Sequence, residues 1–287
     1  MHSDFLGGFI NPPKRLSKSH RLIAEYVSEN FEKVAYMTAA KLGVAVGVSE
    51  STVVRFAIEC GFAGYPEFSR KLQEIIPSKL TSAQRAEVTN LRLGDGDILD
   101  KVLTSDIDKI KSTMLQIDHD AFYKAADAII NSKTIYIMGV RSSSAPAGFM
   151  SYYFSLIFDN VRLVSSTTGS EMFEQVFKAG KDDVVIGISF PRYSKRVVHA
   201  MEYAKNKGAT LIALTDSSDS PIAKTADYTL LAKSDMASFA DSLVAPMSII
   251  NALIVAISKK KKEYIQRVFT ELEAIWDEHD VYEKNNE

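Results

Sequence analysis

The chain has 287 residues, 46% of them hydrophobic, and its 34 Lys and Arg residues nearly balance 36 Asp and Glu residues, giving a net charge of −2. This composition can bury a sizeable core in one large or two ordinary domains, and it excludes a disordered or fibrous chain. One cysteine and five scattered histidines, without CxxC or HxxxH spacing, exclude an internal disulfide and disfavour a zinc site. We therefore expect a cytoplasmic protein without a metal or other cofactor.

No membrane segment is expected. The N-terminus lacks the basic flank and apolar core of a signal peptide. The most apolar run, residues 243–257, is shorter than a bilayer span and contains Pro246, Ser248 and Asn251. This run predicts a buried helix.

A polar stretch that begins at Pro77 and ends at Gly94-Asp95-Gly96-Asp97 is typical of a linker. Residues 1–79 carry ten basic and eight acidic side chains, against 24 and 28 in the rest, so the N-terminal part is the better candidate for contact with an acidic polymer. The expected parts are a helical domain, a linker with a connecting helix, a second domain and a C-terminal helix, at residues 1–77, 78–120, 121–262 and 263–287.

The N-terminal part has a helical pattern throughout. Ser17, Thr38 and Ser49 each precede a segment with apolar residues at helical spacing, as N-cap residues do. Gly47 separates the last two of these segments, and Gly61 ends the last one. Two short helices joined by a tight turn that contains glycine predict a helix-turn-helix.

The segment after Ser49 has an outward face of short polar side chains and one arginine. These residues are Glu50, Ser51, Thr52 and Arg55. Such a face can enter a major groove, where Arg55 could bond a guanine edge or a phosphate, and Ser49 and Thr52 suit phosphate oxygens. The same pattern also fits an ordinary α-hairpin with a solvated face, so the residues alone leave DNA binding as one of two interpretations.

Three phrases in this part are specific: Met37-Thr38-Ala39-Ala40, Gly47-Val48-Ser49-Glu50-Ser51-Thr52-Val53-Val54-Arg55-Phe56 and Gly61-Phe62-Ala63-Gly64-Tyr65-Pro66-Glu67-Phe68. With them, residues 16–72 resemble the N-terminal domain of the RpiR family of bacterial transcriptional regulators. The resemblance implies that the helix from Ser49 recognises double-stranded operator DNA and that Tyr65 lies near the DNA backbone. Cys60 stands where the family more often has a larger apolar residue, which affects packing.

Beyond the linker the pattern changes to alternating helices and strands. Apolar residues at spacings of three and four between Asp97 and Asp118 predict a long amphipathic helix that packs on the following domain. Five apolar, β-rich runs follow, separated by helix-length segments, at 134–138, 161–165, 183–189, 210–215 and 228–231. Continuous apolar strands predict a doubly wound α/β fold with a five-stranded parallel sheet, in which ligands bind at the carboxyl ends of strands.

Hydroxyl and cationic side chains follow the first and third strands, each time directly before a helix. They are Arg141, Ser142, Ser143 and Ser144 in one loop, and Ser189, Arg192, Tyr193 and Ser194 in the other. Hydroxyls, backbone amides and helix N-termini that converge from two loops predict a phosphate site. In one loop alone, serine before a helix is usually only a cap. Neither loop has the glycine pattern of a nucleotide site.

The phrase Ser189-Phe190-Pro191-Arg192-Tyr193-Ser194 makes residues 121–262 similar to the sugar isomerase domain, a phosphosugar-binding module, in the form found in RpiR regulators. The resemblance implies that Ser143 and Ser144 follow the strand where the module binds phosphate, and that Ser189 and Ser194 are the first and last hydroxyls of its second loop. Pro191 and Arg192 replace the Ser-Gly of the enzyme version. For the loop 215–221, after the fourth strand, we expect a lid or rim.

An isomerase needs a base near the sugar carbons. Glu171 supplies a carboxylate after the second strand, but no His-Gly-Asp follows it as in the isomerases that this module resembles. We therefore expect Glu171 to accept a sugar hydroxyl in a sensor site, and we expect no enzyme activity.

The predicted function is a transcriptional regulator of carbohydrate metabolism whose affinity for DNA is set by a phosphosugar effector. We expect a homodimer or higher homo-oligomer that presents recognition helices to half-sites about 34 Å apart, or a multiple of that distance, on a near-palindromic operator. The alternatives are a phosphosugar isomerase with an appended helical domain, and a helical adaptor whose N-terminal face contacts protein.

Overall fold

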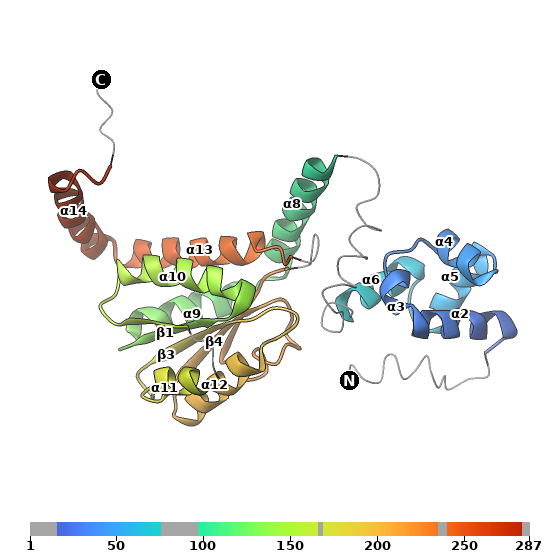
Figure 1. The fold of residues 1–287 in the computed structure, drawn as a ribbon, viewed down its shortest axis with the longest axis horizontal. Coiled ribbons are helices and arrows are strands. Elements are labelled where there is room, and N and C mark those ends of the chain that lie inside the picture. The colour runs from blue at the N-terminus through green and yellow to red at the C-terminus, as the bar shows by residue number, and fades with distance from the viewer. Residues whose placement is uncertain (1–15, 76–96, 166–168, 235–239, 283–287) are drawn as a thin grey trace, which may run out of the picture. The chain divides into compact units, whose positions relative to one another are not determined.

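The computed structural model describes residues 16–75, 97–165, 169–234 and 240–282 (Figure 1). The chain divides into two compact units, with a boundary between Val102 and Leu103. Most of the expected linker, residues 76–96, lies outside the described residues. No helix in the described part of the chain is long and apolar enough to cross a membrane.

The first unit is helical, as predicted. Its described helices are α2 (Lys18–Glu29), α3 (Phe31–Val34), α4 (Ala39–Val46), α5 (Glu50–Glu59) and α6 (Tyr65–Ile75). Ser17, Thr38 and Ser49 are the N-caps of α2, α4 and α5, and each side chain accepts a hydrogen bond from the backbone N–H three residues later. The expected capping residues are therefore confirmed.

A tight turn joins α4 to α5. Gly47 ends α4 with a φ of 76°, a left-handed conformation that glycine adopts without a steric penalty. The two helices pack on α2 and α6 around a fully buried core that includes Ile23, Leu42, Phe56 and Phe68. The sequence prediction of a helix-turn-helix is confirmed.

The second unit contains a five-stranded parallel sheet. Its strands are β1 (Ile135–Gly139), β2 (Val161–Val164), β3 (Val184–Ile188), β4 (Thr210–Thr215) and β5 (Tyr228–Leu231), in the order β2-β1-β3-β4-β5. Every neighbouring pair is parallel, and Ile137 is opposite Leu163 on one side and Ile186 on the other. The carboxyl ends of all five strands therefore lie along one edge of the sheet.

Helices cover both faces of this sheet, as Figure 1 shows. α9 (His119–Asn131), α10 (Ser144–Ser155) and α13 (Val244–Lys260) pack on the face that carries Ile137 and Ile186. α11 (Gly169–Val176) and α12 (Lys195–Asn206) pack on the face that carries Tyr136 and Val185. The doubly wound fold is confirmed, and α13 is the buried helix expected from residues 243–257.

The long helix expected from Asp97 to Asp118 is α8 (Ile98–Gln116). The buried residues of this helix are the polar residues Lys109 and Thr113. Its apolar side chains Leu103, Ile107 and Met114 are exposed. Periodicity therefore predicted the helix correctly, but the buried face is the polar one. The last helix, α14 (Lys262–Glu278), has no buried residue.

Candidate functional site

The loop after β1 turns back on itself before α10 begins. Gly139 is required there, because a Cβ atom would lie 2.2 Å from the backbone oxygen of Ser143. Arg141 has a φ of 57° and opens a short 3₁₀ turn, and Ser144 Oγ donates a hydrogen bond of 2.6 Å to the Arg141 carbonyl. Ser143 is buried, whereas Arg141, Ser142 and Ser144 are exposed.

The loop after β3 closes in a similar way before α12. Ser189 is buried, and its Oγ accepts a hydrogen bond of 3.1 Å from the backbone N–H of Ser194. Arg192 is exposed, and Tyr193 and Ser194 are partly buried. The loop therefore places two serines and an arginine directly before a helix N-terminus.

Ser143 and Ser194 occupy the N-cap positions of α10 and α12, yet neither side chain makes a capping hydrogen bond. This contrasts with Ser17 and Ser49 in the first unit, which do cap their helices. The interpretation of these loop serines as ordinary caps is therefore not supported. At the start of α10 the Ser144 N–H donates to the Arg141 carbonyl, and Pro146 has no N–H.

The loop after β4 contributes a residue that sequence reasoning missed. Asp216 accepts hydrogen bonds from Tyr193 Oη at 2.9 Å and from Thr215 Oγ1 at 3.3 Å. Burial, followed by the charge of Asp216 and the hydrogen bond to it, raises the pKa of Tyr193 well above its usual value. A carboxylate directly after a third strand of the same sheet was the available signal, because all these strands end at one edge.

Glu171 stands apart from these loops in the chain. It is exposed in the first turn of α11, the helix that follows the edge strand β2. Gln175 in the same helix holds the end of β2 by exchanging two hydrogen bonds with the backbone of Ser165. Glu171 therefore lies in the helix that follows β2, the strand that pairs with β1.

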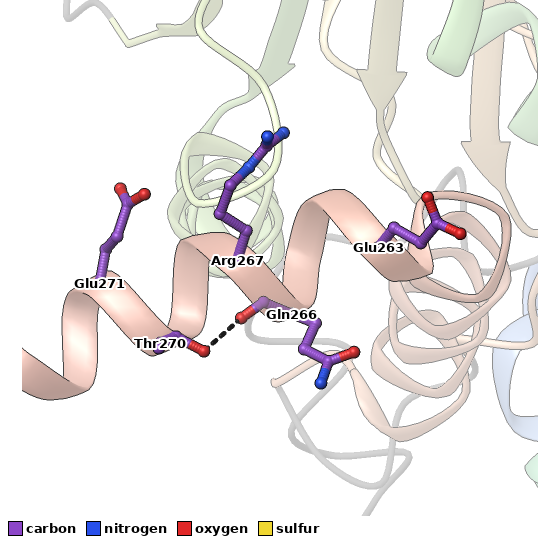
Figure 2. Close-up of a pocket in the computed structure, with 5 residues that line it drawn as sticks. All are labelled: Glu263, Gln266, Arg267, Thr270 and Glu271. Atoms are coloured by element: carbon purple, nitrogen blue, oxygen red, sulfur yellow. Dashed lines mark hydrogen bonds between the residues drawn. The ribbon is translucent and has the colours of Figure 1, made fainter.

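A hollow on α14 lies elsewhere (Figure 2). It is lined by five residues of this one helix, Glu263, Gln266, Arg267, Thr270 and Glu271. A small-molecule site requires polar groups that converge from several elements. This hollow is therefore a groove along a helix surface and not the phosphate site expected from the sequence.

The candidate DNA-reading residues lie at the start of α5. Ser49, Glu50, Ser51 and Arg55 are exposed, and Thr52 is partly buried. Ser49 Oγ lies 2.9 Å from Ser51 Oγ and 2.8 Å from Thr52 Oγ1, and Arg55 Nε donates to the Ser51 carbonyl at 3.2 Å. The structure thus gathers these polar groups on one exposed helix end, as a recognition helix requires.

Tyr65 does not belong with this exposed set. It is 5% exposed, and its hydroxyl donates toward the carbonyl oxygens of Val34 at 3.2 Å and Met37 at 3.1 Å. Burial raises the pKa of Tyr65 well above its usual value. The residue ties α6 to the end of α3 and to the segment that follows it, so the expected position near the DNA backbone is corrected to one in the core.

Comparison with protein families and relatives agrees with both units. The model of the helix-turn-helix domain of the rpiR family matches residues 9–79, and that of the SIS domain matches residues 128–256. An HTH-type transcriptional regulator of Clostridium perfringens is 30% identical over 225 residues, covering 77% of this chain and 78% of its own length. Another, from Caldanaerobacter subterraneus, is 29% identical over 259 residues and covers 87% and 88%.

Solved structures share the fold. The sugar isomerase domain of an RpiR transcription factor from Sphaerobacter thermophilus has a TM-score of 0.59 and 26% identity, and covers 61% of this chain and 98% of that one. NanR of Vibrio vulnificus, complexed with ManNAc-6P, has a TM-score of 0.58 and 22% identity, and covers 94% of this chain and 97% of that one.

The relatives are named as regulators, in agreement with the expectation that the chain is not an enzyme. The chain belongs to the rpiR family of helix-turn-helix transcriptional regulators.

Proposed function

We propose that this regulator binds a phosphosugar at the carboxyl edge of its sheet and that the bound sugar changes its affinity for operator DNA. The observation that carries the proposal is the pair of loops before α10 and α12, where Ser143 and Ser194 occupy N-cap positions without capping. The positive end of a helix dipole favours an anion, and two helix N-termini with serine hydroxyls at the same edge of a sheet favour a phosphate.

The phosphate is assigned to the hydroxyl groups of Ser142, Ser143 and Ser144 in one loop and of Ser189 and Ser194 in the other. Arg141 and Arg192 are exposed near these groups in the chain and supply charge for a dianion. NanR of Vibrio vulnificus, which shares the fold, was solved with a phosphosugar, and this likeness supports a phosphosugar as the class of ligand.

The sugar itself requires hydrogen-bond acceptors for its hydroxyls. We assign this role to Glu171 and to the region around Tyr193, whose hydroxyl is joined to Asp216. Carboxylates accept hydrogen bonds from hydroxyl donors and select a polyol over an apolar phosphate ester. The ligand class is therefore a phosphorylated sugar with free hydroxyls.

For the DNA interaction, we propose that α5 enters the major groove of double-stranded operator DNA. Arg55 is assigned to a guanine edge or a phosphate, and Ser49, Glu50, Ser51 and Thr52 to the groove entrance. The exposure of Ser49, Glu50 and Ser51 at the start of α5, and of Arg55 one turn further along, supports this assignment. Contact with DNA also implies a location in the cytoplasm.

We further propose a homo-oligomer, with a dimer as the basic unit. The exposed apolar side chains Leu103, Ile107, Ile110 and Met114 follow one another on α8 at spacings of four, three and four, as in a helix that pairs with another helix. On α14, Trp276 packs only edge-on against Phe269 and Tyr282 among its described ring contacts. Two DNA-binding units in one particle would recognise a two-fold symmetric operator.

A thermal-shift experiment on the full chain tests the phosphosugar assignment. The panel contains N-acetylmannosamine 6-phosphate, glucose 6-phosphate and fructose 6-phosphate, with the unphosphorylated sugars as controls. A ligand at 100 times its Kd stabilises the native state by about 2.7 kcal/mol, so the melting temperature rises. Ser143→Ala with Ser189→Ala is expected to abolish the shift, and Ser155→Ala, at the end of α10, to retain it. A full shift in the double variant contradicts the assignment.

A further inference from the structure

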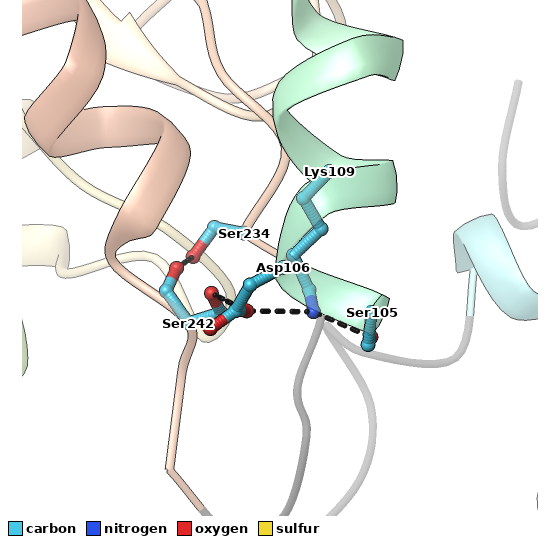
Figure 3. A network of polar contacts seen from close by, with 5 residues as sticks. All are labelled: Ser105, Asp106, Lys109, Ser234 and Ser242. Atoms are coloured by element: carbon cyan, nitrogen blue, oxygen red, sulfur yellow. Dashed lines mark hydrogen bonds and ion pairs between the residues drawn. The ribbon is translucent and has the colours of Figure 1, made fainter. Parts of the chain in front are cut away.

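A network of polar side chains lies where α8 meets the chain around Ser234 and Ser242, within the second unit (Figure 3). Lys109 is 4% exposed, and its Nζ donates to Ser105 Oγ at 2.8 Å and lies 3.3 Å from Asp106 Oδ1. The same Oδ1 accepts a hydrogen bond of 2.7 Å from Ser242 Oγ, and Ser234 Oγ donates to the Ser242 carbonyl at 3.1 Å. We call the contact of α8 with residues 233, 234 and 242 the polar seam.

A second link in the polar seam lies one turn further along α8. Thr113 is buried, and its Oγ1 accepts a hydrogen bond of 2.9 Å from the backbone N–H of Lys233. This bond joins α8 directly to the chain that leaves β5. Asp106, Lys109 and Thr113 lie about a quarter of a turn around α8 from its exposed apolar side chains, and the two buried residues of α8, Lys109 and Thr113, are both polar.

The polar seam is continuous with the candidate phosphosugar site. The residue before Lys233 is Ala232, whose N–H donates to the Thr215 carbonyl at 2.8 Å. Thr215 is fully buried and directly precedes Asp216, which holds the hydroxyl of Tyr193 from the loop after β3. A movement of the loops after β3 and β4 would therefore reach Thr113 through this series of backbone and side-chain hydrogen bonds.

Polar attachment makes α8 easier to displace than an apolar one. The hydrogen bonds of the polar seam can be exchanged for bonds to water, whereas an apolar interface loses its hydrophobic stabilisation when it opens. A buried lysine is tolerated only while it is paired. Lys109 is therefore stable when α8 is docked and the ammonium group is paired, or when that group is in water. A position of α8 that buries the ammonium group without partners is disfavoured. These properties are those of an element with two discrete states.

We propose that the polar seam is a latch through which occupancy of the phosphosugar site sets the position of α8, the helix that leads along the chain to the DNA-binding unit. This inference rests on the proposed function. Residues 76–96 connect α8 covalently to the DNA-binding unit. A shift of α8 therefore moves the point from which the chain leads to that unit and its recognition helix. Asp106 and Thr113 are positioning residues in this scheme and do not touch the sugar.

Hydrogen–deuterium exchange on the full chain tests the latch. The probe is the sugar phosphate of the thermal-shift panel that raises the melting temperature most. In the wild-type protein, saturation with this probe is expected to change the rate of amide hydrogen exchange in residues 103–116 at least threefold. Thr113→Val keeps the side-chain shape but removes the acceptor, and should reduce this change to less than 1.5-fold while the Kd for the sugar stays within threefold. Asp106→Asn serves as a second variant, and Thr104→Val, on the exposed face of α8, is the matched control.

The outcomes separate the two proposals. If no panel member binds the wild-type chain, the proposed function is contradicted, and the latch with it. If a sugar phosphate binds but exchange in α8 does not change, only the latch is contradicted. A wild-type response in both Thr113→Val and Asp106→Asn, or a loss of sugar affinity greater than threefold in them, also overturns it.

Discussion

The hydroxyl of Tyr193 donates a hydrogen bond of 2.9 Å to Asp216 Oδ1 and thereby joins the loop after β3 to the loop after β4. Thr215, the last residue of β4, donates to the same oxygen at 3.3 Å. Neighbouring strands of a parallel sheet end at one edge, but their loops are independent unless side chains connect them. This bond makes the two loops a single unit at the candidate site.

Removal of that bond is expected to weaken phosphosugar binding. Tyr193→Phe retains the ring and deletes the donor to a carboxylate, which is worth about 1.5 kcal/mol, so the Kd should rise about tenfold. Isothermal titration calorimetry measures this directly. Tyr203→Phe, on α12 away from the loop, is the matched control and should bind as the wild type does. Equal Kd values in the two variants would show that the loops are held by other contacts.

Glycine at position 139 is expected to be essential for the loop after β1. In Gly139→Ala the new Cβ would lie 2.2 Å from a backbone oxygen of Ser143, so the loop must move, and the free energy of unfolding should fall by about 2 kcal/mol. Gly148→Ala is the control, because a Cβ there meets nothing within 4 Å and lies inside α10, where alanine is favoured by about 0.5–1 kcal/mol. Urea unfolding compares the two. A Gly139→Ala protein as stable as Gly148→Ala would contradict the close approach.

The sequence predicted elements whose signals are local. Capping serines, the glycine of the turn and the continuous apolar strands each act within a few residues, and the observed helices and strands follow them. The face of α8 could not be predicted in this way, because periodicity reveals an apolar stripe without showing which side meets the domain. Thr113 and Asp106 are bonded by Lys233 and Ser242, which lie 120 and 136 positions away in the chain.

The candidate site was predictable to a similar extent. Strand ends located the two serine loops, since residues after parallel strands share an edge. The pairing of Asp216 with Tyr193 and the burial of Tyr65 depend on tertiary contacts, with partners 23 residues away for Tyr193 and 31 and 28 residues away for Tyr65. A tyrosine beside a turn gives no local sign of whether it faces DNA or the core.

Cys60, at the end of α5, is expected to react slowly with thiol reagents. Burial, followed by the charge of Glu59, raises its pKa from 9.0 to about 11. The thiolate fraction at pH 8 is then about 100-fold below that of a thiol with a pKa of 9, and alkylation by iodoacetamide should slow accordingly. Because it is the only cysteine, the rate is assigned without ambiguity. A rate equal to that of a free cysteine peptide would contradict this.

The same pKa shift gives a pH dependence of stability. The folded state binds the thiol proton more tightly than the unfolded state, so the stabilisation is complete below pH 9 and is lost as the pH rises through about 11. Unfolding of the first unit should therefore become easier over this window. Cys60→Ala removes the titrating group, so the loss of stability between pH 9 and 11 should be smaller in this variant. An unchanged loss of stability in Cys60→Ala would show that another group causes it.

Arg55 is expected to contribute to DNA affinity without supporting the fold. It is exposed, and Arg55→Ala should weaken binding to the operator by about 10- to 100-fold, the range for a base or phosphate contact, at an unchanged melting temperature. Lys124→Ala removes one exposed positive charge from α9 and should leave the affinity within about twofold. Electrophoretic mobility shift with a duplex selected from a random library on the wild-type protein measures both. An unaffected Arg55→Ala protein would favour protein contact by this face.

The central claim is that one chain couples a phosphosugar site to a DNA-reading helix. Fluorescence anisotropy of the selected duplex, titrated with wild-type protein in the absence and presence of the sugar phosphate that stabilises it most, tests this claim most directly. The account predicts that the Kd for DNA differs at least fivefold between the two titrations, the scale of an allosteric coupling, and that affinity falls steeply with salt. The same Kd in both titrations, with the sugar site verified as occupied, would contradict it.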